Sequence, residues 1–392
     1  MVALLTFAVV LLAAVLVSEL AHRSVLSTAV LFLVAGFVAG PGALGLIRLR
    51  PDDPVVSAFA ELALFSVLFT DGMRTGAREL LAAWRLPGQA LLIGLPLTLL
   101  GNALLGRYVV GLGWPEAFLV GAVLSPTDPV FAAAIVGRDE VPLRLRHLLN
   151  VESGLNDGLA LPIVMATLVF VGAPSQFHPL ATLGEVAGGV ALGVAVPWVA
   201  IRLERSRHFK AVGTYEPLLA FAIGLLVLSL SRLLHVNEFL AAFTAGIAVA
   251  TVGPSVRDAF VHLGESLAEL LKLAALLVFG SLITPGLLAG LSWRSYAFAV
   301  LALVAVRPLA LAVALLGNRL DRREWFAAAW FGPKGFASVF FGLLILAARI
   351  PRGPRLFALI ALVVAGSILA HASTDVLVAR WFIREDGEGP TP

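Results

Sequence analysis

The chain has 392 residues, of which 59% are hydrophobic and 14% are charged, with a net charge of +3 and no cysteine. A water-facing surface needs about 25–35% charged residues. The composition therefore excludes an ordinary soluble enzyme, a nucleic-acid-binding protein and a disordered chain, and predicts a polytopic membrane protein. The lack of cysteine also excludes disulfides, thiolate metal sites and cysteine redox chemistry.

Apolar stretches separated by charged or Gly/Pro-rich breaks predict an all-α protein with about thirteen transmembrane helices. A helix satisfies its own backbone hydrogen bonds in lipid, which favours helices over strands for these stretches. The first stretch lacks a basic n-region and a cleavage site, so we interpret it as a retained span rather than a signal peptide. The expected spans are 2–19, 24–47, 55–72, 86–106, 114–137, 148–171, 180–201, 215–234, 239–253, 264–286, 294–317, 324–348 and 355–379.

The distribution of Lys and Arg predicts the orientation. With these spans, 17 basic residues fall in segments on the side of the C-terminus and 8 on the opposite side. The positive-inside rule then places the N-terminus outside and the C-terminus in the cytoplasm. We expect a bacterial or archaeal plasma-membrane protein whose residues 380–392 form a short cytoplasmic tail.

Two spans carry proline and polar residues near their middle. Span 114–137 contains Ser125-Pro-Thr-Asp-Pro129, and span 324–348 contains Gly332-Pro-Lys-Gly335. Proline lacks a backbone N–H, so each span is expected to break into two half-helices. The breaks lie seven spans apart, and an odd offset reverses direction, which predicts two inverted six-helix repeats with crossed discontinuous helices. Ordinary proline kinks are the alternative, although a kink needs no charged neighbour.

Each of these breaks carries one charged residue. Half-helix N-termini are partially positive and C-termini partially negative. Asp128 suits the first kind of end and Lys334 suits the second. For Asp128, contact with a cation is an equally good interpretation.

Span 148–171 carries two carboxylates, Glu152 and Asp157, which are expensive in a bilayer. Ser153 and Asp157 share one helix face, with Glu152 and Asn156 as a second pair beside it. Carboxylate, hydroxyl and amide oxygens suit a hard cation. Because burial raises the pKa of a carboxylic acid, such a group can hold a proton and a cation in competition, as an antiporter requires.

Other charges within spans are expected to form structural ion pairs. Lys334 is available as a partner for Glu152, and Asp71, at the end of span 55–72, is a candidate partner for Arg307. Charge pairing is the usual way in which ionisable residues persist in lipid.

Taken together, these motifs resemble the monovalent cation/proton antiporter superfamily, and within it the NhaP-like sodium/proton exchanger branch. The resemblance covers essentially the whole chain in order. It rests on Phe69-Thr-Asp-Gly72, Ser125-Pro-Thr-Asp-Pro-Val130, Glu152-Ser-Gly-Leu-Asn-Asp157, Phe239-Leu-Ala-Ala-Phe-Thr-Ala-Gly246 and Gly332-Pro-Lys-Gly-Phe-Ala-Ser338.

The resemblance implies an NhaA-like inverted-repeat fold, a homodimer and elevator-type alternating access. It implies a dimerisation part at about 1–72 and 180–286 and an ion-transport core at about 86–171 and 294–379. It carries cation contacts over to the residues Asp157, Asp128, Thr127 and Ser153, with Glu152 nearby.

In the family, an Asp in place of Asn156 accompanies electrogenic exchange, so Asn156 implies electroneutral exchange of one proton for one cation. The chain departs from its branch at Lys334, where Arg is usual. Lys is a compact point charge that shifts its pKa when buried, whereas Arg stays charged. We hypothesise that Lys334 pairs with Glu152.

The leading interpretation is a sodium or lithium/proton antiporter that contributes to pH homeostasis and needs no cofactor. A potassium/proton antiporter of the same fold is the alternative, because oxygen ligands alone do not separate the two ions. A cation channel is a further alternative. An intramembrane hydrolase using Ser153 is disfavoured by its acidic neighbours.

Overall fold

The computed structural model describes residues 2–16, 28–49, 53–74, 77, 81, 84–128, 141–172, 179–206, 215–318 and 320–383. In the first half of the chain the helices are α1 (Val2–Leu16), α3 (Thr28–Ala39), α4 (Pro54–Arg74), α6 (Arg85–Gln89), α7 (Leu95–Leu105), α8 (Trp114–Val123), α10 (Leu143–Val171) and α11 (Pro179–Glu204). In the second half they are α12 (Glu216–Leu233), α13 (Glu238–Val252), α14 (Pro254–Leu282), α15 (Pro285–Ala289), α16 (Trp293–Leu301), α17 (Arg307–Ala314), α18 (Arg322–Trp330), α19 (Phe336–Ala347), α20 (Gly353–Ala372) and α21 (Asp375–Ile383).

Each of the thirteen expected spans overlaps at least one of these helices, and the described residues form an all-helical protein. Among the residues that the structure describes, six helices are long and apolar enough to cross a membrane: Arg85–Val110, Leu143–Val171, Leu180–Glu204, Glu216–Leu233, Trp293–Ala314 and Gly353–Ala372. The multi-pass membrane protein predicted from composition is thereby supported, whereas the count of thirteen and the inverted repeat stay predictions. Several boundaries were wrong. Helix α14 begins at Pro254, ten residues before the expected span, α3 ends at Ala39, eight residues before the expected end, and α20 ends at Ala372, seven residues early.

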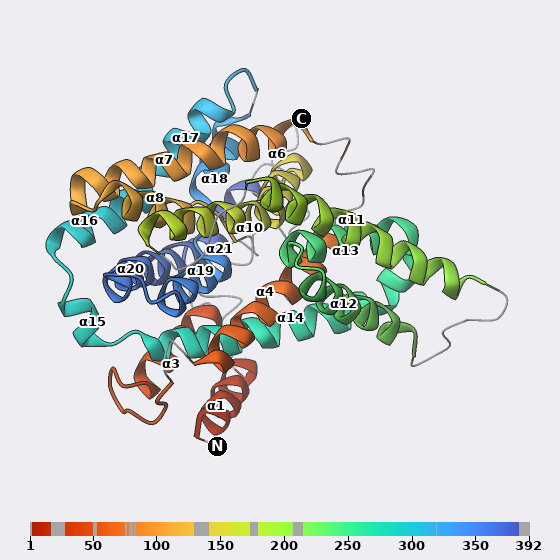
Figure 1. The fold of residues 1–392 in the computed structure, drawn as a ribbon, viewed down its shortest axis with the longest axis horizontal. Coiled ribbons are helices and arrows are strands. Elements are labelled where there is room, and N and C mark those ends of the chain that lie inside the picture. Colours follow the sequence, from red (N-terminus) through yellow and green to blue (C-terminus); the bar gives the residue numbers. More distant parts are fainter. Residues whose placement is uncertain are drawn as a thin grey trace, which may run out of the picture.

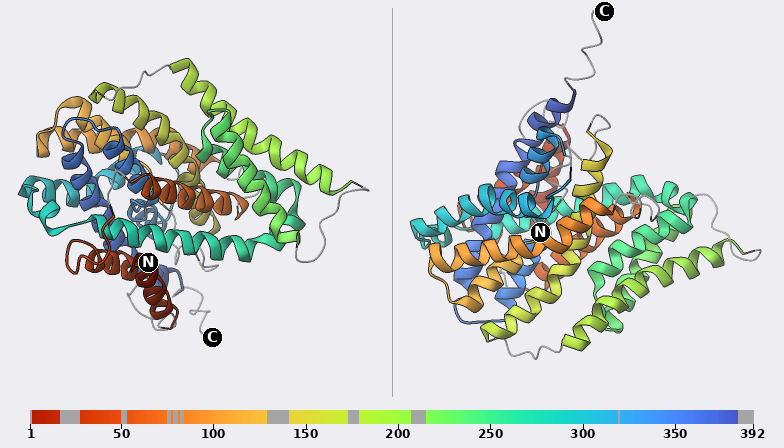
Figure 2. Two further views of the ribbon diagram at one scale, coloured as in Figure 1. Left: turned by 60° about the horizontal axis from the view of Figure 1, so that its bottom comes forward. Right: turned by 90° about the horizontal axis from the view of Figure 1, so that it is seen from above.

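The helices fall into two groups (Figures 1 and 2). Helices α11, α12 and α13 lie together at one end, and α7, α8, α16 and α17 lie at the other, with α4 and α10 between them. Helix α13 packs against α4 and α11, and α14 packs against α3 and α4. Backbones approach closely there, because a Cβ added at Gly72 would lie 2.2 Å from the carbonyl oxygen of Phe243. Small residues allow such close helix packing in membranes.

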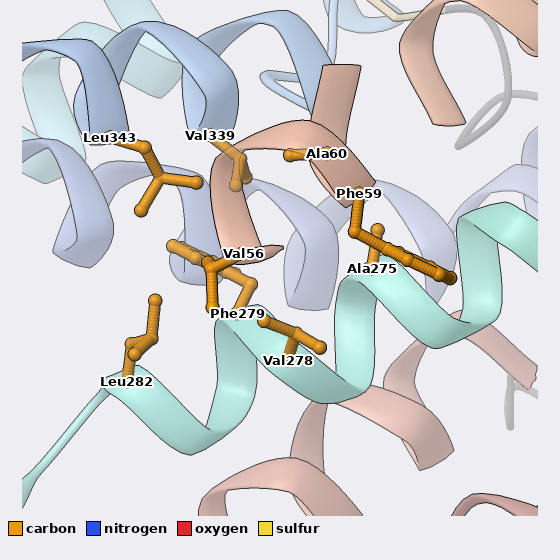
Figure 3. Close-up of a pocket in the computed structure, with 9 residues that line it drawn as sticks. All are labelled: Val56, Phe59, Ala60, Ala275, Val278, Phe279, Leu282, Val339 and Leu343. Atoms are coloured by element: carbon orange, nitrogen blue, oxygen red, sulfur yellow. The ribbon is translucent and has the colours of Figure 1, made fainter. Parts of the chain in front are cut away.

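The contact of α19 with α4 and α14 is apolar. A small hollow, with a volume of about 10 Å³, lies between these three helices (Figure 3). Aliphatic and aromatic side chains from all three helices line it, and the lining has no charged group. These residues are Val56, Phe59, Ala60, Ala275, Val278, Phe279, Leu282, Val339 and Leu343.

Two long helices contain π-helical turns. One helix runs from α6 to Val110 and contains the turns Ala90–Gly94 and Gly106–Val110. The other runs from α16 into α17 and contains Ala302–Val306, immediately before Arg307. Such turns are frequent at functional sites, and the third one leads into the buried Arg307.

Candidate functional site

The two spans with predicted breaks meet at non-helical stretches. Helix α18 ends at Trp330 and α19 begins at Phe336, with residues 331–335 non-helical between them. In the other span α8 ends at Val123 and residues 126–128 are non-helical, while the expected second half-helix lies outside the described residues. The backbone N–H of Asp128 donates to the carbonyl oxygen of Pro333 at 2.8 Å, which joins the two breaks directly.

Each break carries a charge that serves the other span. Oδ2 of Asp128 accepts a hydrogen bond of 3.0 Å from the backbone N–H of Phe336, the first residue of α19. Nζ of Lys334 donates to the carbonyl oxygens of Ser125 and Pro126, at 3.4 and 3.2 Å, just beyond the end of α8. Asp128 thus lies at a positive helix end and Lys334 at a negative one, as the sequence predicted. The sequence did not indicate that each charge crosses to its partner span.

Three small residues make this crossing fit. A Cβ at Gly335 would lie 2.1 Å from Oδ2 of Asp128, so no side chain is compatible with this approach. Oγ of Ser338 donates to the carbonyl oxygen of Val123 at 2.8 Å. Oγ of Ser367 accepts from the backbone N–H of Lys334 at 2.7 Å and lies 3.1 Å from Nδ1 of His371. Sequence reasoning assigned no role to either serine. Ser338 lay within a quoted motif, whereas Ser367 is one hydroxyl in an apolar helix and gave no local signal.

The polar face of α10 contacts the first break. The side chains of Ser153, Asn156 and Asp157 are all buried. Oγ1 of Thr127 lies 3.0 Å from Oγ of Ser153 and accepts a hydrogen bond of 2.8 Å from Nδ2 of Asn156. The structure therefore brings together Thr127, Ser153 and Asn156 from the predicted site.

Asp157 lies beside this cluster on the same helix. Its Oδ1 atom is buried and has no hydrogen-bond partner within the described part of the chain, and the same is true of Oδ1 of Asn156. Asp128, Asp71 and Lys334 lie within electrostatic range of Asp157. A buried polar atom without a partner is costly, and a buried carboxylate oxygen suits a proton or a hard cation.

The expected Lys334–Glu152 ion pair is wrong, because Glu152 pairs with Arg307. Nη1 and Nη2 of Arg307 donate to the two carboxylate oxygens of Glu152 at 2.7 and 2.9 Å, and its Nε donates to the carbonyl oxygen of Ala328 at 3.2 Å. The planar guanidinium matches both carboxylate oxygens, which a single ammonium cannot do. Lys334, a point charge, instead lies on two backbone carbonyls.

The expected Asp71–Arg307 pair is wrong as well. Nη1 of Arg74, one turn along α4, lies 3.5 Å from Oδ1 of Asp71. The same guanidinium donates to Oε1 of Glu265 on α14 at 2.9 Å. A basic residue three positions away on the same helix is a closer partner. Arg74 lies just beyond the expected span 55–72, where a basic residue indicates orientation rather than pairing.

Comparison with known proteins agrees with this architecture. The K(+)/H(+) antiporter NhaP of Alkalimonas amylolytica is 25% identical over 384 residues, which cover 96% of this chain and 66% of that protein. The Na(+)/H(+) antiporter 2 of Zygosaccharomyces rouxii is 30% identical over 258 residues, which cover 59% of this chain and 31% of that protein. The chain thus spans less than two thirds of the length of these relatives.

A solved structure shares the fold. The sodium proton antiporter MjNhaP1 from Methanocaldococcus jannaschii, at pH 8, superposes with a TM-score of 0.81 at 19% identity, covering 98% of both chains. In addition, the family described as sodium/hydrogen exchanger, transmembrane, matches residues 7–380. The chain therefore belongs to the transmembrane sodium/hydrogen exchanger family, whose members are transporters and not enzymes.

Proposed function

We propose that the protein is an electroneutral antiporter that exchanges one sodium or lithium ion for one proton, with Asp157 binding the two in competition. The observation that carries the proposal is the buried Oδ1 atom of Asp157, which has no protein partner among the described residues. Burial makes the charged form costly unless a cation compensates it. Deprotonated carboxylate with cation and protonated carboxyl without it are then the two stable forms.

The neighbouring charges are compensated within the protein. Glu152 is held by Arg307, Asp128 by the N-terminus of α19, and Lys334 by the carbonyls beyond α8. Glu152 is therefore a structural residue in this proposal rather than a cation ligand. Asp157 is left as the carboxylate that exchanges its partner.

Oxygen atoms around Asp157 complete the proposed site. Thr127 and Ser153 supply hydroxyl oxygens, and Asp128 supplies a carboxylate across the break. Asn156 orients Thr127 through its amide N–H. Because an amide does not titrate, the site exchanges one proton for one cation, and the exchange moves no net charge.

We further propose elevator-type alternating access in a homodimer. The core of residues 86–171 and 294–379 would move as one body, since backbone and side-chain hydrogen bonds pin its two breaks together. The apolar contact of α19 with α4 and α14 supports such sliding, because the residues that line it in the described part of the chain are aliphatic or aromatic (Figure 3). The distribution of basic residues supports an N-terminus outside and a C-terminus inside a bacterial or archaeal plasma membrane.

The central test is Asp157→Asn, measured as cation-driven proton movement in proteoliposomes. We expect exchange to be abolished, because the amide cannot bind and release a proton. Asp258→Asn is the matched control, since Asp258 is exposed on α14 and paired with its neighbour Arg257. Cation-coupled proton movement that persists in Asp157→Asn would overturn the mechanism.

Potassium is the second candidate substrate, and the relatives named K(+)/H(+) antiporters favour testing it. A panel of Li⁺, Na⁺ and K⁺ in the same proteoliposomes, with and without an imposed membrane potential, decides between the ions. Rates that respond to the potential contradict electroneutral exchange. A steady current beyond any fixed coupling would indicate a channel.

A further inference from the structure

A carbonyl group on α10 lies free of its own helix one residue after Asp157. Within an α-helix, the carbonyl of residue 158 would accept from the N–H of residue 162. Residue 162 is proline and lies inside α10, so it has no N–H to donate. The carbonyl of Gly158 therefore needs a partner from elsewhere, because an unpaired carbonyl in a dry interior is costly.

Asn237 supplies that partner from another helix. Its Nδ2 donates to the carbonyl oxygen of Gly158 at 2.9 Å, and its Oδ1 caps α13 by accepting from the N–H of Leu240 at 3.0 Å. Its backbone N–H donates to the carbonyl oxygen of Glu185 on α11 at 2.9 Å. The buried Asn237 thus joins α10, α11 and α13 at one point.

The surrounding packing fixes the height of α10, that is, its position along the axis of α13. Gly154 and Gly158 lie one turn apart and form a groove along α10. A Cβ at Gly154 would lie 2.0 Å from the ring of Phe243, and one at Gly158 would lie 2.6 Å from the side chain of Leu240. Two side chains of α13 therefore occupy the groove in a defined register.

We propose that Asn237 is a positioning residue that holds α10, and with it Asp157, at one height against α13. This hydrogen bond acts as a latch: it stabilises the present arrangement of α10 and α13 and must break when α10 moves relative to α13. The importance of this height for transport rests on the proposed function of Asp157. The latch itself is a property of the two helices and is testable without transport.

Two substitutions separate the latch from other roles of Asn237. Asn237→Ser keeps a good helix cap, but the short side chain does not reach Gly158. Pro162→Ala returns an N–H to α10, so that Gly158 no longer depends on Asn237. Asn237→Asp is the second variant should the serine protein not fold, because it keeps the cap acceptor and lacks the donor.

Spin-label distances measure the latch in the purified full chain. The lack of cysteine allows a clean label pair, at the exposed positions Phe170 on α10 and Leu233 on α12. We expect Asn237→Ser to raise a second distance population by about two- to tenfold, the effect of one hydrogen bond on an equilibrium. In the Pro162→Ala background the same substitution should have little further effect.

The outcomes are distinct. An unchanged distance distribution in Asn237→Ser overturns the latch, and so does an equal effect of that substitution in both backgrounds. An effect of Asn237→Ser that persists in a protein also carrying Asp157→Asn keeps the latch, even when the proposed role of Asp157 fails.

Discussion

At the scale of single residues, the buried charges differ in how they are compensated. Arg307 and Glu152 satisfy each other through two parallel hydrogen bonds, with both side chains buried. Removing one member of such a pair leaves an uncompensated buried charge, whereas removing both does not. The pair is therefore expected to affect the stability of the fold more than cation affinity.

Arg307→Met is expected to destabilise the protein by about 3–5 kcal/mol, because Glu152 stays buried without its partner. The double variant Arg307→Met with Glu152→Gln should lose much less stability than Arg307→Met alone. Thermal unfolding in detergent, followed in both variants and in Glu152→Gln alone, measures the difference. Additive losses in the double variant would contradict the ion pair as the cause.

Lys334 is expected to stabilise the end of α8. Lys334→Met removes the donor to the carbonyls of Ser125 and Pro126 and should cost about 1–3 kcal/mol, the penalty for unpaired buried acceptors. Lys272→Met is the control, because Lys272 contacts the half-buried Glu269 on its own helix rather than backbone carbonyls. Equal melting temperatures for Lys334→Met and the parent protein would argue against this role.

The role of a residue could be predicted from the sequence where that role depends on the neighbouring residues in the chain. Asp128 and Lys334 stand beside prolines that end helices, so their positions at helix ends follow from the local sequence. The partner of Glu152 depended on which distant helices meet, and the spacing of charges along the chain did not contain it. The i,i+3 spacing of Asp71 and Arg74, in contrast, was visible in the sequence. Asn237 had a local signal, as Asn before Glu and an apolar run indicates a helix cap. Its contact with Gly158 follows only once α13 is placed against α10.

At the scale of elements, the broken spans were predicted from Pro, Gly and charge, whereas the start of α14 was missed. Residues 254–263 carry Arg257 and Asp258 and begin with proline, a composition that resembles a loop. Proline at the first helical position is in fact favourable. The helix continues because one of its faces is buried, and this amphipathic character was obscured by the charges.

The crossing of the broken spans depends on the absence of a side chain at position 335. Gly335→Ala is expected to abolish transport and to lower the melting temperature, because its Cβ would overlap the carboxylate of Asp128 and the backbone of α19 is fixed there. Gly286→Ala is the matched control, since nothing lies within 4 Å of its added Cβ. Proteoliposome exchange and thermal unfolding of both variants make the comparison. Normal exchange in Gly335→Ala would show that the approach is not required.

At the scale of the whole molecule, the fold class and the positions of the two non-helical stretches were accessible from sequence. The division into a core and a dimerisation part came from family resemblance and stays a proposal. The physical argument for it is the contrast between two contacts. The crossing is dense in hydrogen bonds, while α19 meets α4 and α14 through apolar side chains.

Competition for one carboxylate sets the expected pH dependence of the assembled transporter. As pH falls, protonation of Asp157 competes with cation binding, so the apparent KM for the cation should rise. The rise should approach about tenfold per pH unit once the protonated form predominates. The maximal rate at saturating cation should change far less. Initial rates over a matrix of pH and cation concentration test this relation. A KM independent of pH across the active range would exclude a shared site.

The π-helical turn Ala302–Val306 has a consequence for comparing this protein with its relatives. A π-helical turn holds one residue more than an α-helical turn. The residues that follow it are therefore shifted by one position in the chain relative to a continuous α-helix. A relative without this turn would place its buried arginine one residue earlier in the chain. An ungapped alignment would then match Arg307 to the wrong neighbour, and equivalence of this arginine between homologues has to be assigned by superposition of the helices.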